Sequence, residues 1–334
     1  MTEVADFARD AEAAGFETIW IPDSQFLWHD AWTTATLVAD RTNRIGIGVA
    51  VTNFETRHVA ITANVISSVD ELSGGRVQVA FGSGDSAVKT IGRRPTLLRD
   101  MRESIAILRR LLRGEDVVWE GSDKYGGRPM RLRHPAGRDV PIFMAATGPK
   151  ALALAGEVAD GVIVAAGVAP HLIVRALNYV REGAERGGRS LAELNVFLAA
   201  HTIVAPDEGS AVREVKPLCL AMAQLGAKEA LRAVGIEIDV PAVVAGIYPD
   251  VTHAESWDLA VRTAEDYIDD AAAERYAAGL TLAGTAEQVA KRIEAAIGTG
   301  MGINGFFLIG PSSYELPRNQ LDAFGSTLIP RFGR

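Results

Sequence analysis

Short apolar runs recur along the chain and are separated by longer amphipathic segments. Segments such as "LLRDMRESIAILRRLLRG" (97–114) repeat their apolar positions with the helical period. Nearly continuous apolar strands that alternate with helices predict a parallel sheet covered on both faces. Because seven such runs occur in 334 residues, the pattern favours an α/β fold of the (β/α)8 TIM barrel type over a doubly wound sheet. The runs are residues 17–21, 45–51, 76–82, 141–146, 161–166, 196–205 and 304–310.

The first segment of the chain, "TEVADFARDAEAAGF", has a helical pattern, and no strand pattern comes before it. A closed barrel needs a strand ahead of this helix. We therefore expect either that the first strand is missing from this chain or that the barrel is open at that edge.

The alternation stops between Ala205 and Gly305, where the segments "PLCLAMAQLGAKEALRAVG" and "AESWDLAVRTAEDYIDDAAAERYAAG" are helical in character. We interpret the chain as one barrel domain over residues 1–334 with a helical insertion at about 207–284, before the last strand. Insertions that follow barrel strands usually cover the mouth of the active site.

Small, polar and glycine-rich residues follow the predicted strands. In barrels, the chemistry takes place at the C-terminal ends of the strands, and glycine lets a ligand approach the backbone closely. We therefore expect the site at these positions. They are Asp23-Ser24-Gln25, Thr52-Asn53, Gly82-Ser83-Gly84-Asp85, Thr147-Gly148-Pro149-Lys150, Gly167 and Gly310-Pro311.

Two of these strand ends resemble phosphate-binding turns. In "ATGPKALALAG" a strand ends at Ala146 and Pro149 suits a first helical turn, so the helix N-terminus offers amide groups to an anion. A plain turn with Thr147 as N-cap explains the same pattern equally well. The short loop "GSGDS" (82–86) favours an ordinary turn over a ligand loop.

Composition excludes several classes of protein. The net charge is −8 with no basic stripe, so nucleic acid is not an expected partner. One cysteine, no visible signal peptide and no bilayer-length apolar stretch predict a cytoplasmic protein without a membrane anchor. The six histidines show no metal-ligand spacing, and no nucleophile elbow or P-loop occurs. An organic cofactor is therefore the expected carrier of the chemistry.

Four segments together resemble the bacterial luciferase-like monooxygenase superfamily: "AGFETIWIPDS", "GIGVAVTNFETRHVAITA", "DELSGGRVQVAFGSGDSAV" and "PIFMAATGPKALALAGEVADGVIV". Within it they are similar to the branch that uses the deazaflavin coenzyme F420 and includes methylenetetrahydromethanopterin reductase. The resemblance implies a (β/α)8 barrel with an insertion before the last strand, as the pattern already suggests.

The resemblance also implies roles for residues at the strand ends. The V-T-N step implies a cis peptide at Ala50–Val51, in a bulge with Thr52 and Asn53 that supports the cofactor ring. Asp23 corresponds to an acid in contact with the cofactor. Gly82, Gly84 and Asp85 correspond to a loop beside the cofactor. The phosphate-binding turn corresponds to Ala146, Thr147, Gly148, Pro149 and Lys150.

One departure from the family concerns proton transfer. F420 enzymes often have histidine after the acid, where this chain has Ser24. Ser24, Gln25 or His29 are candidates to replace the imidazole, unless the reaction needs no such group. Trp28 and Trp32 either wall a substrate pocket or pack the following helix. His58, after Arg57, and His201, in mid-strand, are interpreted as structural.

Three functions remain open. The first is hydride transfer between F420 and a small organic substrate. The second is a two-component monooxygenase that uses FMN, oxygen and a flavin reductase, and the third is a non-enzymatic barrel. Four cations, Lys89, Arg93, Arg94 and Lys150, suit the acidic tail of F420 and favour the first. The strongly apolar segment 59–72 also predicts a homodimer.

Overall fold

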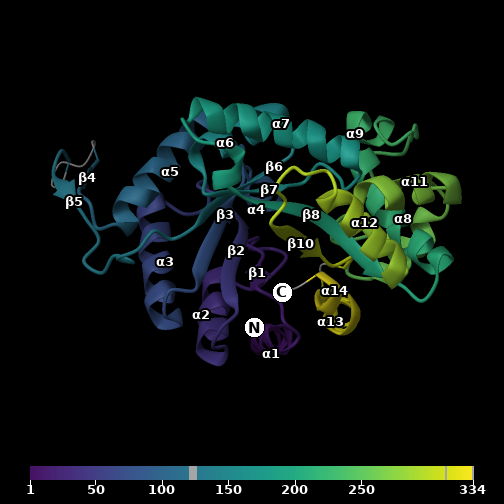
Figure 1. The fold of residues 1–334 in the computed structure, drawn as a ribbon, viewed down its shortest axis with the longest axis horizontal. Helices are drawn as coiled ribbons and strands as arrows, with labels where there is room; N and C mark the ends of the chain where they lie inside the picture. The colour runs from purple at the N-terminus through teal and green to yellow at the C-terminus, as the bar shows by residue number, and fades with distance from the viewer. Residues whose placement is uncertain (120–125, 313, 333–334) are drawn as a thin grey trace. The chain divides into compact units, whose positions relative to one another are not determined.

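The computed structural model describes residues 1–119, 126–312 and 314–332 (Figure 1). The chain divides into two compact units. Unit 1 comprises Met1–Ala146, Lys150–Val162 and Val180–Leu194, and unit 2 comprises Thr147–Pro149, Ile163–Tyr179 and Asn195–Arg334. Each unit contains parallel strands joined by helices, so each is described by itself.

Unit 1 contains four parallel strands in the order β1-β2-β3-β6. Their side chains are largely buried, because helices follow the strands along the chain and cover them. β1 is the least buried, and β2 is its strand neighbour among the described residues. The strands are β1 (Thr18–Ile21), β2 (Gly46–Thr52), β3 (Val77–Phe81) and β6 (Ile142–Ala146).

The helices of unit 1 pack in chain order, α1 on α2, α2 on α3 and α3 on α5 (Figure 1). Each of these helices has apolar residues among those that it buries. A short antiparallel pair, β4 (Val117–Val118) and β5 (Pro129–Met130), follows α5. The helices are α1 (Thr2–Ala13), α2 (Ala31–Arg41), α3 (Val59–Ser73), α4 (Ser86–Lys89), α5 (Leu98–Leu112) and α6 (Pro149–Val158).

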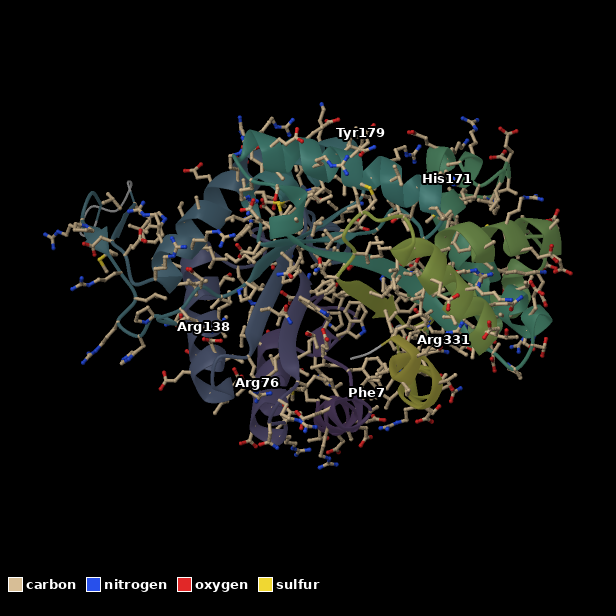
Figure 2. All side chains as sticks on the ribbon, in the orientation of Figure 1. Phe7, Arg76, Arg138, His171, Tyr179 and Arg331 are labelled. Carbon is tan, nitrogen blue, oxygen red and sulfur yellow. The ribbon has the colours of Figure 1, made fainter. Side chains whose placement is uncertain are left out.

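Two arginines that precede strands of unit 1 along the chain donate hydrogen bonds to backbone and carboxylate oxygens (Figure 2). Arg76, just before β3, donates to the carbonyl oxygens of Ala39 and Thr42 at 3.0 and 2.9 Å. Arg138 binds the buried carboxylate of Asp70 through Nε at 3.0 Å and Nη2 at 2.5 Å. These contacts close the N-terminal ends of the strands with polar groups, opposite the ends that carry the predicted site.

Unit 2 is built on β8 (Asn195–Val204), which has different neighbours along its length. Its residues Phe197–His201 pair with β10 (Gly305–Ile309) and its last three residues pair with β9 (Leu282–Gly284), both in parallel. β7 (Gly161–Val164) and α7 (Pro170–Arg186) each run from one unit into the other along the chain.

Helices of unit 2 gather around a second apolar core that includes Cys219, Trp257 and Tyr276. Among the described residues no helix has the length and apolar character needed to cross a bilayer. The helices are α8 (Glu208–Gln224), α9 (Lys228–Arg232), α10 (Trp257–Ala264), α11 (Asp270–Leu280), α12 (Ala286–Ile297), α13 (Arg318–Ala323), the π-helix Phe324–Leu328 and α14 (Ile329–Phe332).

All seven strands expected from the sequence are present, and so are the helices expected between Ala205 and Gly305. No closed barrel forms among the described residues, because β1 pairs with β2 and β10 with β8 while no described strand closes the ring. Three short strands were not predicted. β4, β5 and β9 have two or three residues each, too few to show a period, and pairing alone makes them strands.

Glycines allow α6 and α7 to approach closely. A Cβ added at Gly183 would lie well inside van der Waals distance of the Ala153 carbonyl oxygen, and one added at Gly156 would meet the Val180 carbonyl oxygen in the same way. Both neighbours are backbone atoms, so neither can move aside cheaply.

We therefore expect Gly183→Ala to lower the free energy of unfolding by about 3 kcal/mol through overpacking. The measurement is urea denaturation followed by circular dichroism. Gly209→Ala in α8 is the control, since its Cβ would meet only the Asp207 side chain, at 3.3 Å. Equal stability of the two variants would contradict the close packing.

Candidate functional site at the strand ends

An ion-pair network joins the C-terminal ends of β1 and β2. Asp23 Oδ2 accepts hydrogen bonds from Thr52 Oγ1 at 2.7 Å and from Arg57 Nη1 at 2.6 Å. Arg57 Nη2 donates to Asp30 Oδ2 at 2.6 Å. Asp30 is the N-cap of α2 and accepts from the Thr33 amide at 2.8 Å. Two strand ends, one helix start and the loop after β2 are therefore held by a single guanidinium group.

The electrostatics of the network keep Arg57 and Asp30 charged. Burial by itself would lower the pKa of Arg57, but the hydrogen bonds and charges of Asp23 and Asp30 outweigh it and raise that pKa. Burial would raise the pKa of Asp30, and the Thr33 hydrogen bonds and the Arg57 charge instead lower it. The Asp23 side chain is 8% exposed. It holds the strand ends together, and its contact with a cofactor stays a prediction.

The end of β2 departs from a regular ladder. Val49 pairs with Val79 and Thr52 with Phe81, so β2 has one residue more than β3 between these pairs. The Ala50–Val51 peptide is cis, which confirms the prediction for this bond. The Val51 side chain is 40% exposed, while its neighbours on the strand are buried. The bulge thus presents an apolar side chain at the end of an otherwise buried strand.

A compact turn follows the bulge. Asn53 is buried, and its Oδ1 accepts from the amides of Glu55 and Thr56, both at 2.9 Å. Phe54 stacks on Phe81 of β3 with ring centroids 4.1 Å apart. The polar V-T-N ending therefore has a structural reason. Thr52 serves the ion-pair network, and Asn53 satisfies the amides of the turn.

Ser24 lies next to the network and is buried, and its Oγ has no hydrogen-bond partner among the described residues. Its carbonyl oxygen accepts from the amides of Leu27 and Trp28 at 3.1 and 3.0 Å. A buried hydroxyl without a partner is uncommon in folded proteins and marks a place where a water or a ligand completes the site.

The other candidates after β1 have different positions. Gln25 Nε2 donates to the Ala87 carbonyl oxygen at 2.7 Å, so this side chain connects two loops. His29 is exposed, and its proton-transfer role stays a prediction. Trp28 is half-buried, whereas Trp32 is buried in α2, which favours packing over a pocket wall for Trp32.

The glycine-rich loop after β3 packs against the bulge. The Gly82 amide donates to the Thr52 carbonyl oxygen at 2.9 Å, and a Cβ at Gly82 would lie 2.7 Å from Val51 Cγ1. Gly84 has a positive φ of 94° and approaches Val88 closely. Asp85 is exposed and forms an ion pair with Lys89. The loop supports Val51, while its contact with a cofactor stays a prediction.

The turn before α6 is open. Ala146 is the buried last residue of β6, and Thr147, Pro149 and Lys150 are exposed. A Cβ added at Gly148 would meet no atom within 4 Å. The start of α6 is therefore accessible to an anion, although phosphate binding there remains a prediction.

Two of the four predicted cations already have partners in the chain. Lys89 pairs with Asp85, and Arg93 Nη1 donates to the Glu55 carbonyl oxygen at 3.0 Å. Arg94 and Lys150 are exposed. His58 caps α3 through Nδ1, which accepts from the Ala60 amide at 3.2 Å, so its structural interpretation is confirmed.

Unit 2 holds polar groups that the sequence did not single out. Asp250 and His253 form a hydrogen-bonded pair at 3.0 Å, and the spacing "DVTH" was the only signal of it. A cavity of about 270 Å³ between α8, α11 and α12 includes Arg275 and Arg292. In the described part of the chain, no group of three His, Cys, Asp or Glu residues is arranged to hold a metal ion.

Comparisons with known proteins agree with this architecture. The family model for luciferase-like monooxygenases matches residues 1–302. A 5,10-methylenetetrahydromethanopterin reductase from Methanolobus tindarius is 40% identical over 214 residues, which are 63% of this chain and 63% of that protein. The aligned region thus covers less than two thirds of the relative's length.

Solved structures show the same TIM-barrel-like α/β fold. The structure of the coenzyme F420 dependent tetrahydromethanopterin reductase from Methanopyrus kandleri matches with a TM-score of 0.78 and 26% identity, covering 99% of this chain and 95% of that chain. The FMN-bound oxygenating constituent of 3,6-diketocamphane monooxygenase from Pseudomonas putida matches with a TM-score of 0.70 and 18% identity, covering 98% and 92%. The second likeness concerns the fold alone.

The network around Arg57 leads to a stability prediction. We expect Arg57→Met to lower the free energy of unfolding at neutral pH by about 3 kcal/mol, because it leaves the buried Asp23 carboxylate without its cation. A carboxyl group whose pKa is lower in the folded state than in the unfolded state, as for Asp30, stabilises the fold above its unfolded-state pKa of about 3.9. This stabilisation is lost as the pH falls through the pKa of the folded state. The difference from wild type should therefore shrink below about pH 4.

Denaturation at several pH values measures this effect. Arg99→Met removes an exposed ion pair with Asp100 and should change stability by less than about 0.5 kcal/mol. A loss in Arg57→Met that stays constant down to low pH would show that side-chain packing, rather than charge, is responsible.

Proposed function

This chain belongs to the luciferase-like monooxygenase family, and we propose that it is an oxidoreductase that transfers a hydride between coenzyme F420 and a small organic substrate. The family match covers residues 1–302. The likeness to the reductases of Methanolobus tindarius and Methanopyrus kandleri supports F420 as the cofactor.

The observation that carries the proposal is the exposed Val51 side chain on the β2 bulge. Gly82 lies directly against this side chain, and the 53–56 turn closes the strand end beyond it. An apolar side chain supported by backbone suits one face of a flat ring system. The adjacent polar network keeps the surrounding strand ends rigid.

Two further features fit a flavin-like cofactor. The Ser24 hydroxyl is buried and lacks a partner among the described residues, so a hydrogen-bonding group of a ligand can satisfy it. The open backbone at Gly148 leaves room for a phosphate at the start of α6. When bound, F420 supplies hydride chemistry, while the protein orients the reactants, excludes water and provides proton transfer.

The choice of F420 over FMN depends on charge as well as on likeness. F420 has an acidic tail that FMN lacks, and exposed cations near the strand ends suit such a tail. Arg93 and Lys89 have acidic partners, so Arg94 and Lys150 carry more of this argument than the sequence suggested. The second candidate is an FMN-dependent monooxygenase supplied by a flavin reductase, which the likeness to the FMN-bound enzyme keeps open.

The proposal predicts selective cofactor binding. We expect the purified protein to bind F420 in an anaerobic fluorescence titration, and Gly148→Val to weaken that binding about tenfold or more by covering the phosphate-binding backbone. Gly148→Ala is the matched control, since its Cβ would meet nothing within 4 Å. Unchanged affinity in Gly148→Val would show that the turn is only structural.

A double variant in the same titration separates the two cofactors. Arg93→Gln with Arg94→Gln should weaken F420 binding more than FMN binding, and more at low salt than at high salt, because the tail is charged. Tight FMN binding without measurable F420 binding would overturn the choice and favour the monooxygenase.

We also propose that the protein is a cytoplasmic homodimer, and the shape of α3 supports the dimer. Its inner face buries Ile66 and Val69. Its outer face has Ile61 and Leu72, which are 61% and 51% exposed, with the half-buried Val65 between them. These positions recur at whole helical turns, so they form one apolar stripe. A second copy of the chain is the occupant that we propose for it.

The dimer should depend on that stripe. Ile61→Glu combined with Leu72→Glu is expected to convert a dimer into a monomer of 35.6 kDa in analytical ultracentrifugation. Val118→Glu changes another exposed apolar residue, which is 54% exposed, and should leave the dimer intact. A wild-type protein that sediments as a monomer at every concentration would refute the proposal.

A further inference from the structure

The cavity of unit 2 lies where four elements of that unit meet. The helices α8 and α11 pack on each other (Figure 1), and both contact β9, which contacts α12 in turn. All the residues that line the cavity belong to unit 2. Its volume of about 270 Å³ is just below the range of about 300–1,000 Å³ that is typical of small-molecule sites. The cavity therefore suits a small ligand.

Arg292 of α12 brings a positive charge to the lining of this cavity and is half-buried there. Its Nη1 donates to the Ala283 carbonyl oxygen, which is its one hydrogen bond to the described residues. No carboxylate in the described part of the chain forms an ion pair with it. Burial lowers the pKa of this guanidinium, and the charge of Glu208 opposes that effect. Because guanidinium has five N–H donors, most of them are left for water or a ligand.

Other half-buried arginines of this protein are satisfied from within the chain. Arg57 binds two carboxylates, and Arg138 binds the carboxylate of Asp70. Arg76 donates five hydrogen bonds to carbonyl and hydroxyl oxygens. Arg292 differs from all three, since it has a single carbonyl partner among the residues described. A partly buried guanidinium with free donors beside a cavity is a ready site for an anion.

Gln288 adds a second donor beside Arg292. The two residues are four positions apart on α12 and therefore share one face of the helix. A Cβ added at Gly284 would lie 2.7 Å from Gln288 Oε1 and 3.0 Å from Arg292 Nη1, so both side chains lie against the Gly284 backbone. Gln288 Oε1 accepts from the Thr285 amide at 2.9 Å. This contact orients the side-chain amide, whose Nε2 has no acceptor among the residues that the structure describes.

The rest of the lining sets the size and the charge of the ligand. Three charged residues of the lining, Glu208, Glu274 and Arg275, are exposed. Two carboxylates and one guanidinium make this exposed part negative, so it repels a second negative charge on a ligand. The buried apolar part of the lining consists of small side chains, namely Ala211, Val212, Ala277 and Ala283.

We propose that this cavity is a binding site for a small organic monocarboxylate. The carboxylate accepts hydrogen bonds from Arg292 and Gln288, and a short apolar chain lies against the alanine side chains. A planar carboxylate matches the donor geometry of a guanidinium group, and the exposed acids exclude dianions. This inference uses residues of unit 2 alone, and it holds whether or not the protein binds F420.

The first test is a calorimetric titration of the protein, without cofactor, with butanoate. We expect a Kd on the order of 1 mM, because a ligand of this size has few atoms to bury. Arg292→Met should weaken binding about tenfold or more by removing the charged donor. Lys291→Met is the matched control, since Lys291 is the exposed neighbour of Arg292 on α12 and does not line the cavity. Equal affinity of Arg292→Met and wild type would overturn the site.

The second test fills the cavity and leaves Arg292 in place, so it stays decisive if Arg292→Met folds poorly. Ala278 is an exposed residue of α11 that lines the cavity. Ala278→Leu should weaken butanoate binding about tenfold or more, because its added methyl groups occupy the ligand volume. Ala271→Leu makes the same change at an exposed position of α11 outside the lining and should bind as wild type. Urea denaturation of both variants checks that they are folded.

The class of ligand is tested by comparing acids of equal chain length. Succinate has the four carbons of butanoate and a second carboxylate, and we expect it to bind at least about tenfold more weakly, because the exposed acids repel that charge. Succinate binding as tight as that of butanoate would overturn the monocarboxylate assignment. Absence of measurable butanoate binding by the wild type would overturn the proposal as a whole, and it would leave the F420 titration unaffected.

Discussion

One guanidinium group, that of Arg57, connects most of the elements that the site in unit 1 depends on. It binds Asp23 after β1 and Asp30 at the start of α2, and Asp23 in turn accepts the Thr52 hydroxyl at the end of β2. A buried carboxylate needs such a partner, because an unpaired charge is costly in a medium of low polarity. Satisfying Asp23 therefore also sets the positions of two strand ends and one helix. Ser24 follows Asp23 directly, and its buried hydroxyl has no hydrogen-bond partner among the described residues.

The surface at the end of β2, beside the Arg57 network, is shaped mostly by the backbone. The extra residue in β2 turns Val51 outwards, and the absence of a side chain at Gly82 makes room for it. Asn53 then satisfies the amides of the following turn from inside. This arrangement supplies shape and an apolar face but no strong acid, base or nucleophile. The proposed function therefore assigns the redox chemistry to a bound organic cofactor.

Unit 2 has titratable groups of its own, on β8 and in the segment that follows α9. The long strand β8 pairs with β10 through Phe197–His201 and with β9 through Thr202–Val204. His201 is neutral and fixed in the strand, while Asp250 and His253 belong to a loop anchored by buried Val251 and Ala254. The segment between β8 and β10 therefore does more than connect two strands. It carries an ordered carboxylate–imidazole pair on an apolar core of its own.

The sequence alone was sufficient to predict the longer strands, the helices and the family to which the chain belongs. Apolar runs of four to ten residues and helical periods are local patterns, and they predicted all seven longer strands together with the glycine-rich strand ends. The family resemblance also placed the cis peptide at Ala50–Val51. The three-residue strand β9 was not predicted, because pairing with Thr202–Val204 of β8 decides its conformation. The ion-pair partners of the charged residues were not predicted either, because they too depend on contacts between distant segments. Nothing near Arg57 in the sequence indicates Asp23. The periodicity of helices and strands is a local property of the sequence and can be read from it. The partner of a charged residue depends instead on how distant segments pack, so only the tertiary structure decides which ion pairs form.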